Sequence, residues 1–324
     1  MNVDGFRADI LREPETLAAL VDAYLAPDGP LDGIDGRLER PRRVLFTGMG
    51  SSRYAALSAA RWLRAAGVDA HVEYASATLA LPPSPETLVI AISASGASEE
   101  TVAALDRHAG TSPTIAVTNH PERALGHAAD AALPLLAGEE VGGIACASYQ
   151  CTVAVLLLLA ARIAGAPAPE AELRAAVAAG GHLRDTRAAW LPQAVELLDG
   201  GDAIDVIGPD DRIAAVEQSA LMLREAPRVR AAGCETGDWL HVEVYLSRHA
   251  GYRALLLAGS PYDAGVMDWA RKRDSTIVAV GRPVGGSRLD VTYPRAHEPL
   301  VALLTDTMVA ELVAAELWQR RGGG

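Results

Sequence analysis

Short runs of apolar residues, separated by stretches with helical spacing, constrain the fold of this chain more than any other feature. The first run occupies 43–48 and is followed by a helical pattern over 55–66. Similar runs follow at 71–74, 87–93 and 114–118, with a further candidate at 131–136. Strands that are apolar on both faces belong in a parallel sheet covered by helices on both sides. The first half is therefore predicted to be a doubly wound parallel α/β domain.

The second half repeats this pattern in outline. A Pro-rich linker at 165–169 and a helical stretch over 170–198 lead to apolar runs at 203–208, 254–259, 276–281 and 289–293. One helix is expected from about 300 to 318. The expected organisation is an N-terminal helical arm (1–38), a first α/β domain (39–165) and a second (170–324).

Composition and charge exclude several classes of protein. The net charge of −12, without a local basic patch, argues against nucleic-acid binding. The chain has three cysteines with no metal-ligand spacing, which indicates a reducing compartment and neither disulfides nor structural zinc. The most apolar run, 152–160, is too short to span a bilayer, and the N-terminus has no apolar signal core. A soluble cytoplasmic protein without membrane contact is expected.

The first motif is the turn 48–54, between a predicted strand and a helix. Backbone N–H groups at Gly50 and the hydroxyl of Ser52 are placed there to receive an anion. A dinucleotide fingerprint would need a glycine where Arg53 stands, which argues against NAD even though Glu73 lies at a suitable distance for a ribose contact. No cofactor is expected.

The second motif is a serine-rich segment, 92–101, at another strand end. It places Ser93, Ser95 and Ser98 around Gly96. Helix capping accounts for one of these hydroxyls, at Ser98, but does not require the other two. Neutral hydroxyls together with backbone amides suit a phosphate monoester that has to be bound and released.

The third motif pairs a carboxylate with an imidazole, Glu225 with His241. Pro227 ends the preceding helix, so Glu225 lies in the last turn, where the helix dipole disfavours ionisation and raises its pKa toward that of a general base. An ion pair with Arg224 or Arg228 explains the residue equally well. Arg224, Arg228 and Arg230 can alternatively be interpreted as a small anion site. Apart from this pairing, His241 is an ordinary surface or core histidine.

With these motifs in place, the chain resembles double sugar-isomerase (SIS) domain proteins and is similar to the isomerase half of glucosamine-6-phosphate synthase. The resemblance covers nearly the whole chain, and the matching segments are 10–17, 47–54, 92–101, 115–119, 140–152 and 221–241. It implies two flavodoxin-like SIS domains that bind a sugar phosphate.

The resemblance also assigns roles to individual residues. It implies that Glu225 moves a proton between C1 and C2, and that His241 assists ring opening across the interface of a homodimer. It further implies that the phosphate lies against a group of hydroxyls and glycines: Ser52, Ser93, Ser95, Ser98, Gly50, Gly96 and, near the same pocket, Ser148.

Several departures from the synthase narrow this expectation. The chain begins directly at the arm, so a glutaminase domain is not expected, and Met222 replaces a lysine of the catalytic helix. The lysine-bearing tail is missing and Lys272 is the only lysine, which argues against Schiff-base chemistry. The expected enzyme is an isomerase, deaminase or deglycase that acts on an amino-sugar or sugar-amine phosphate. The alternative is a sugar-phosphate sensor without turnover. No metal site is expected, because His241, Glu243 and His249 match no metal motif.

Overall fold

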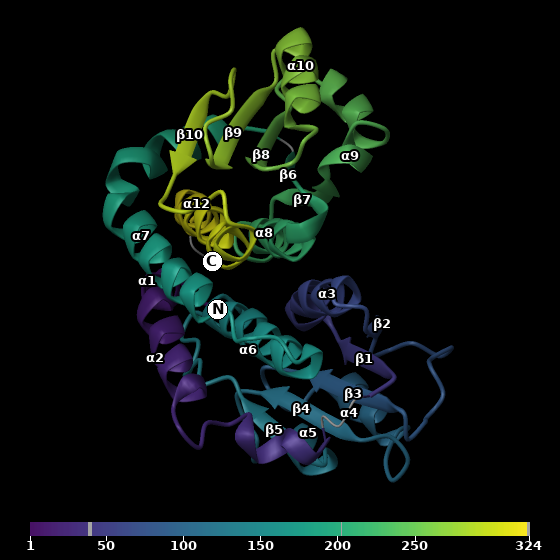
Figure 1. The fold of residues 1–324 in the computed structure, drawn as a ribbon. Helices are drawn as coiled ribbons and strands as arrows, with labels where there is room; N and C mark the ends of the chain where they lie inside the picture. The colour runs from purple at the N-terminus through teal and green to yellow at the C-terminus, as the bar shows by residue number, and fades with distance from the viewer. Residues whose placement is uncertain (38–40, 202, 323–324) are drawn as a thin grey trace. The chain divides into compact units, whose positions relative to one another are not determined.

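The computed structural model describes residues 1–37, 41–201 and 203–322. The chain forms two compact units, each assembled from separate segments. The serine unit contains Glu15–Glu139 and Ala147–Ala171, and the glutamate unit contains Met1–Pro14, Glu140–Cys146 and Glu172–Gly324. Each has a five-stranded parallel sheet with flanking helices, which confirms the predicted α/β class (Figure 1).

The sheet of the serine unit has the strand order β2-β1-β3-β4-β5, with every pair parallel. Its strands are β1 (Arg43–Gly48), β2 (Asp69–Tyr74), β3 (Thr87–Ile92), β4 (Thr114–Thr118) and β5 (Ala131–Pro134). Its helices are α2 (Glu13–Leu25), the 3-10 helix η1 (Asp32–Arg37), α3 (Gly50–Ala65), α4 (Glu99–Asp106), α5 (Ala124–Ala128) and α6 (Ala147–Ala164). In Figure 1, α3 and α6 lie on one face of the sheet and α4 and α5 on the other.

Helix α6 agrees with the apolar helix that the sequence predicts from about residue 148 to 163, and it extends beyond the most apolar run, 152–160. At 18 residues it is long and apolar enough to cross a membrane by length and composition. Its residues from Ala147 to Ala161 are all buried, and it packs against α3. Burial along most of its length is typical of the core helix of an α/β unit, where apolar side chains are removed from water by the sheet and the neighbouring helix.

The sheet of the glutamate unit has the order β10-β9-β8-β6-β7, again entirely parallel. Its strands are β6 (Ala203–Gly208), β7 (Arg230–Glu235), β8 (Arg253–Leu257), β9 (Thr276–Gly281) and β10 (Leu289–Thr292). Its helices are α1 (Val3–Leu11), α7 (Glu170–Leu198), η2 (Asp210–Arg212), α8 (Ile213–Glu225), α9 (Thr236–Trp239), η3 (Glu243–Arg248), α10 (Asp263–Arg273), α11 (Pro299–Thr305) and α12 (Thr307–Arg320).

Two local expectations are wrong. Strand β7 lies in a segment for which no strand is predicted, because its small and polar residues lack an apolar run. The single C-terminal helix is two helices that meet at Asp306, whose buried carboxylate accepts hydrogen bonds from Arg212 and Tyr293. Both differences arise from tertiary contacts, which local periodicity does not report.

The first helix of the predicted arm is tied to the end of the chain. Helix α1 packs against α12, where the rings of Phe6 and Trp318 lie 6.2 Å apart between centroids. The segment 140–146 completes this part of the glutamate unit, since the Gly142 N–H donates to Asp9 Oδ2 at 2.7 Å. The two helices of the arm therefore contribute to different units: α1 to the glutamate unit and nearly all of α2 to the serine unit.

Candidate functional site

The turn that follows β1 presents backbone groups at the carboxyl edge of the first sheet. Helix α3 begins at Gly50, and its N-cap residue, Met49, provides no side-chain hydrogen bond to the first turn. Gly50 adopts φ +49°, a left-handed conformation that glycine accepts without strain. Ser52 lies in the same turn of the helix. Because the N–H groups of a helical first turn point away from the helix, this end of α3 is suited to an anion.

The serine-rich segment lies beside this turn. Strands β1 and β3 are neighbours in register, with Gly48 opposite Ile92, so the serine loop (Ser93 to Ser98) starts next to the end of β1. The hydroxyls of Ser93 and Ser95 are 3.3 Å apart. Strand order reverses at this point of the sheet, and in open parallel sheets ligands bind in the crevice where it does.

Gly96 is required by the shape of the serine loop. Its φ is +64°, and a Cβ at this position would lie 2.8 Å from Thr118 Oγ1 and 2.9 Å from the His120 carbonyl oxygen. A side chain would therefore force the loop away from β4. The predicted cap is also present: Ser98 accepts a hydrogen bond from the Thr101 N–H at 3.3 Å, which starts α4.

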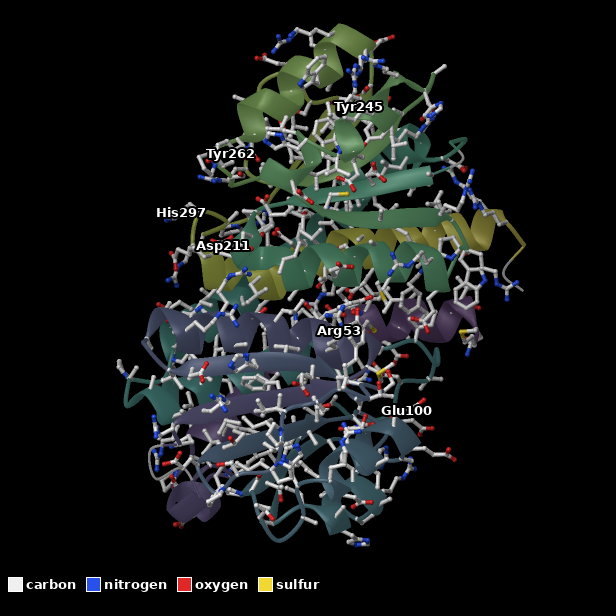
Figure 2. All side chains as sticks on the ribbon, turned by 90° about the vertical axis from the view of Figure 1, so that its right-hand side faces the viewer. Arg53, Glu100, Asp211, Tyr245, Tyr262 and His297 are labelled. Carbon is white, nitrogen blue, oxygen red and sulfur yellow. The ribbon has the colours of Figure 1, made fainter. Side chains whose placement is uncertain are left out.

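Two arginines that were not among the predicted site residues make contacts in this part of the serine unit. Arg123 donates to the Ser95 carbonyl oxygen at 3.0 Å. The guanidinium of Arg53 lies over the ring of Tyr74, 4.3 Å from its centroid, and Figure 2 shows Arg53 and Glu100 in the serine unit. In the sequence, Arg53 is noted only because it stands where a dinucleotide fingerprint would have a glycine. Its stacking partner, Tyr74, is the last residue of β2, which pairs with β1.

Ser148 lies in the first turn of α6, within the serine unit. Its side chain is buried, with the residue 2% exposed, and its carbonyl oxygen accepts a hydrogen bond from Thr152 Oγ1 at 2.6 Å. The structure therefore places all seven of the predicted phosphate-binding residues in one unit. It brings the turn after β1 and the serine loop together directly, while Ser148 comes from a helix packed against α3.

Glu225 is the last residue of α8 in the glutamate unit, in the last turn as predicted. Within the described residues it forms no ion pair, and the Arg224 guanidinium instead donates to the Ala231 carbonyl oxygen at 2.8 Å. The alternative that Glu225 only neutralises Arg224 or Arg228 is therefore wrong. The residue is exposed at the helix end, but the protein around its carboxyl group removes enough water to raise its pKa. The Glu140 carboxylate raises this pKa further.

The predicted direction of this pKa shift agrees with the structure, but the named causes differ from the helix dipole that the sequence suggested. His241 lies directly beyond α9, is exposed, and donates its backbone N–H to the Asp238 carbonyl oxygen at 2.9 Å. Strand β7 connects the two residues in sequence: it starts after Glu225, and Glu235 at its end accepts the Asp238 N–H to begin α9.

Large apolar side chains are exposed on the segment that follows His241. Tyr245 is 63% exposed and Tyr262, from the loop before α10, is 57% exposed. Figure 2 shows both on the outside of the glutamate unit. Val242 and Leu246, on the same segment as Tyr245, are exposed as well. In the part of the chain that the structure describes, no group of three or more His, Cys, Asp or Glu side chains is placed to hold a metal ion.

Comparison with known proteins agrees with this architecture. Residues 37–162 match the family model of the SIS domain. The glutamine–fructose-6-phosphate aminotransferase [isomerizing] of Zymomonas mobilis is 32% identical over 94% of this chain and 54% of its own length. That of Aeropyrum pernix is 28% identical over 78% of this chain and 43% of its own length. The chain thus spans about half the length of these curated relatives.

Solved structures show the same fold at lower identity. The C-terminal domain of glucosamine-fructose-6-phosphate aminotransferase from Francisella tularensis aligns with a TM-score of 0.85 at 18% identity, covering 99% of this chain and 97% of that one. Tagatose-6-phosphate ketose/aldose isomerase from Escherichia coli aligns with a TM-score of 0.79 at 17% identity, covering 98% and 93%.

Proposed function

We propose that the chain is an enzyme that moves a proton between C1 and C2 of a phosphorylated sugar, on the grounds that residues 37–162 match the SIS domain and that the chain is similar to glutamine–fructose-6-phosphate aminotransferases [isomerizing]. The substrate class is a hexose or amino-sugar 6-phosphate. Names among its relatives and structural neighbours, which include a tagatose-6-phosphate isomerase and a glucosamine-6-phosphate deaminase, support this class.

In this proposal the phosphate binds at the carboxyl edge of the first sheet. The hydroxyls of Ser52, Ser93 and Ser95 donate to its oxygens, with Ser98 and Ser148 at the border of the pocket. The backbone N–H groups near Gly50 and Gly96 complete the site. The uncapped first turn of α3 and the adjacent ends of β1 and β3 support this assignment. Neutral donors hold a dianion without making its release slow.

The observation that carries the proposed reaction is Glu225, a carboxylate at the end of a buried helix with a raised pKa and no ion pair among the described residues. A carbon next to a carbonyl is a weak acid, so its proton transfer needs a base that is stronger than an ordinary carboxylate. Glu225 would take the proton from one carbon, and the pair of electrons left behind forms an enediolate. The hydroxyl proton would pass from one oxygen of the enediolate to the other, and Glu225 would return its proton to the neighbouring carbon.

His241 assists ring opening in this proposal by moving a proton between the ring oxygen and the anomeric hydroxyl. It would reach the sugar from the partner subunit of a homodimer. The exposed apolar side chains of Val242, Tyr245 and Leu246, which follow His241 closely in sequence, support such an interface, since exposed apolar side chains favour association. If the substrate carries an amine on C2 or C1, the same proton transfer would precede hydrolytic loss of the amine.

The test is an NMR assay in deuterated water with a panel of hexose, amino-sugar and fructosamine 6-phosphates. Deuterium should enter C1 or C2 of at least one compound with the native protein. Glu225→Gln should lower the exchange rate by about a hundredfold or more. Glu217→Gln, the same change two turns earlier on α8, serves as the matched control and should keep the native rate.

Undiminished exchange in Glu225→Gln would show that another group is the base. Saturable binding of the sugar phosphates with no exchange over the whole panel would instead favour a sensor that uses the same phosphate site without turnover.

A further inference from the structure

His241 lies at the end of a helix that is too short to be stable by itself. Helix α9 has only four residues, Thr236–Trp239, and an isolated helix of this length does not persist in water. Directly beyond it, His241 and Val242 both donate their backbone N–H groups to the Asp238 carbonyl oxygen, at 2.9 and 3.0 Å. The backbone of His241 therefore moves together with α9, and the contacts that fix α9 also fix His241.

The indole of Trp239 anchors α9 in the core. This residue is 1% exposed and belongs to an apolar cluster with side chains from β6, β8 and α10, including Ile207, Leu256 and Val266. A buried indole needs a partner for its N–H group. Trp239 Nε1 donates to the Tyr252 hydroxyl oxygen at 2.9 Å, and the two rings lie 6.2 Å apart between centroids. Helix α9 is thereby attached to the residue just before β8.

The Tyr252 hydroxyl connects this attachment to the sheet. While it accepts a hydrogen bond from the indole, it donates its own proton to Asp205 Oδ2. Asp205 is the third residue of β6 and is 5% exposed. A hydroxyl group can accept and donate at the same time, so the three side chains form one continuous series of hydrogen bonds. The Tyr252 network, formed by the side chains of Trp239, Tyr252 and Asp205, thus ties the helix before His241 to β6.

The chain is also held on the other side of His241. Val244, three residues later, is buried and belongs to the same apolar cluster as Trp239. Its carbonyl oxygen accepts hydrogen bonds from the Ser247 hydroxyl and from the guanidinium of Arg273, at the end of α10. His241 therefore lies on a short segment that a buried residue holds at each end.

We propose that the Tyr252 network positions His241 for ring opening. The hydroxyl of Tyr252, shared between Trp239 and Asp205, holds α9 in place so that the imidazole of His241 reaches the ring oxygen of the sugar. This inference rests on the proposed role of His241. Proton transfer requires a donor within hydrogen-bond distance, and a displacement of about 1 Å can lower the rate about a hundredfold. Tyr252 and Asp205 are positioning residues that act through α9 and not through contact with the sugar.

A substrate that cannot close its ring separates this role from a merely structural one. Fructose 6-phosphate closes its ring through the hydroxyl on C5, whereas 5-deoxyfructose 6-phosphate lacks that hydroxyl and stays open. Tyr252→Phe removes the shared hydroxyl and keeps the aromatic ring. Deuterium exchange into fructose 6-phosphate should fall about ten- to a hundredfold, while exchange into the open compound should stay within about twofold of the native rate. A general loss of folded protein would lower both rates equally.

Two control variants separate the network from general stability. Tyr293→Phe removes a hydroxyl that donates to the buried Asp306 in the same unit, so it should lower the melting temperature as Tyr252→Phe does and keep both exchange rates native. Asp205→Asn keeps an oxygen that can accept from Tyr252 and should preserve most of the ring-opening rate. Asp205→Val leaves the hydroxyl without its acceptor and should behave like Tyr252→Phe.

His241→Gln sets the scale of the effect, since it should slow exchange into fructose 6-phosphate about a hundredfold and leave the open compound unaffected. If it does so while Tyr252→Phe slows neither compound, the inference is overturned and the proposed function stands. If His241→Gln slows neither compound, His241 does not open the ring, and this part of the proposed function is wrong.

Hydrogen exchange of the backbone amides tests the network without a substrate. The N–H groups of His241 and Val242 are protected by the Asp238 carbonyl oxygen. Tyr252→Phe should lower this protection about tenfold, and Tyr293→Phe should leave it native. Native protection in Tyr252→Phe would refute the network whatever the substrate is. Lost protection, in a protein that carries deuterium into no sugar phosphate, would refute the proposed reaction and with it the role in ring opening.

Discussion

In the serine unit, the carboxyl edge between β1 and β3 carries hydroxyls and backbone groups. In the glutamate unit, the side chain of Arg212 occupies the corresponding edge between β6 and β8. The two sheets have equivalent strand orders: the first is β2-β1-β3-β4-β5, and the second, read from its other edge, is β7-β6-β8-β9-β10. Arg212 is 3% exposed and donates to the Leu257 and Ala258 carbonyl oxygens at 3.2 and 2.8 Å.

The charge of Arg212 is neutralised inside the protein. Its guanidinium pairs with the fully buried Asp306, which also accepts the hydroxyl of Tyr293. A Cβ on Gly259, directly after β8, would collide with the guanidinium. The topology therefore offers a crevice at the same place in both sheets, but a side chain fills one of them. The comparison teaches that the strand order locates a possible site, and the residues that follow the strands decide whether it binds a ligand or stabilises the fold.

Arg212→Met should have the largest effect, because it leaves Asp306 buried without its partner. We expect the free energy of unfolding to fall by about 3–5 kcal/mol in urea denaturation. Phosphate binding by the serine loop should persist in the folded fraction. Adding Asp306→Leu should restore most of the lost stability, since a buried ion pair can be replaced by apolar groups at little cost. If the single variant loses less than about 1 kcal/mol, the arginine is not the stabilising element of this edge.

The stability of the glutamate unit should depend on pH through two buried carboxyl groups. Glu13 and Glu311 are fully buried, and a hydrogen bond pairs their carboxyl groups with each other. Burial raises the pKa of Glu13 well above its usual range and that of Glu311 to about 7. Because the folded state holds protons that the unfolded state has released, stability should be greatest below the ordinary glutamate pKa and fall as pH rises toward about 7.

In Glu311→Gln, only Glu13 still holds a proton in the folded state that the unfolded state releases. The new amide can also donate a hydrogen bond to Glu13. Thermal unfolding should show a flatter dependence on pH and a gain of about 2 kcal/mol at neutral pH. Glu316→Gln, on the same helix but only half-buried, is the control and should keep the native dependence. The serine unit provides a contrast, because the neighbouring Arg43 lowers the pKa of the exposed Asp69. If the melting temperature of Glu311→Gln depends on pH as steeply as that of the native protein, Glu13 and Glu311 do not govern the pH dependence of stability.

The smallest expected effect comes from single hydroxyls of the serine loop. Ser93→Ala should weaken the binding of a hexose 6-phosphate by about tenfold, since one hydrogen bond to a charged group is lost. Stability should change by less than about 1 kcal/mol. Ser260→Ala removes a hydroxyl from the loop after β8 in the glutamate unit, where it accepts the Tyr262 N–H, and should leave phosphate binding unchanged. Equal losses of affinity in both variants, measured by calorimetry, would contradict the distinction between the two edges.

Much of the fold could be predicted because its strands are apolar on both faces. All six residues of β3 are buried, and a run of that kind is visible without any tertiary information. Strand β7 has no such run, since it pairs only with β6 and its residues Ala231, Ala232 and Gly233 are small. The break between α11 and α12 was equally hidden, because Asp306 becomes buried through contacts with Arg212 and Tyr293, which are distant in sequence.

The candidate site divides in the same way. The serine loop and the position of Glu225 at a helix end are local features, and the sequence predicts both. The contributions of Arg53, Arg123 and Glu140 depend on neighbouring strands or on a distant loop. The raised pKa of Glu225 shows the limit of local reasoning. The sequence suggested the helix dipole as its cause, whereas the structure gives partial removal of water from the carboxyl group and a carboxylate 85 residues earlier in the chain.

The docking of α1 against α12 has a consequence for synthesis of the protein. Phe6 is made before its partner ring, Trp318, which follows about 310 residues later. At usual elongation rates this interval lasts tens of seconds. All segments of the serine unit are complete by residue 171, so that unit can fold during translation while α1 still exposes its apolar face. The nascent chain thus presents the apolar face of α1 without its α12 partner throughout that interval, which makes α1 a segment that chaperones could bind during synthesis.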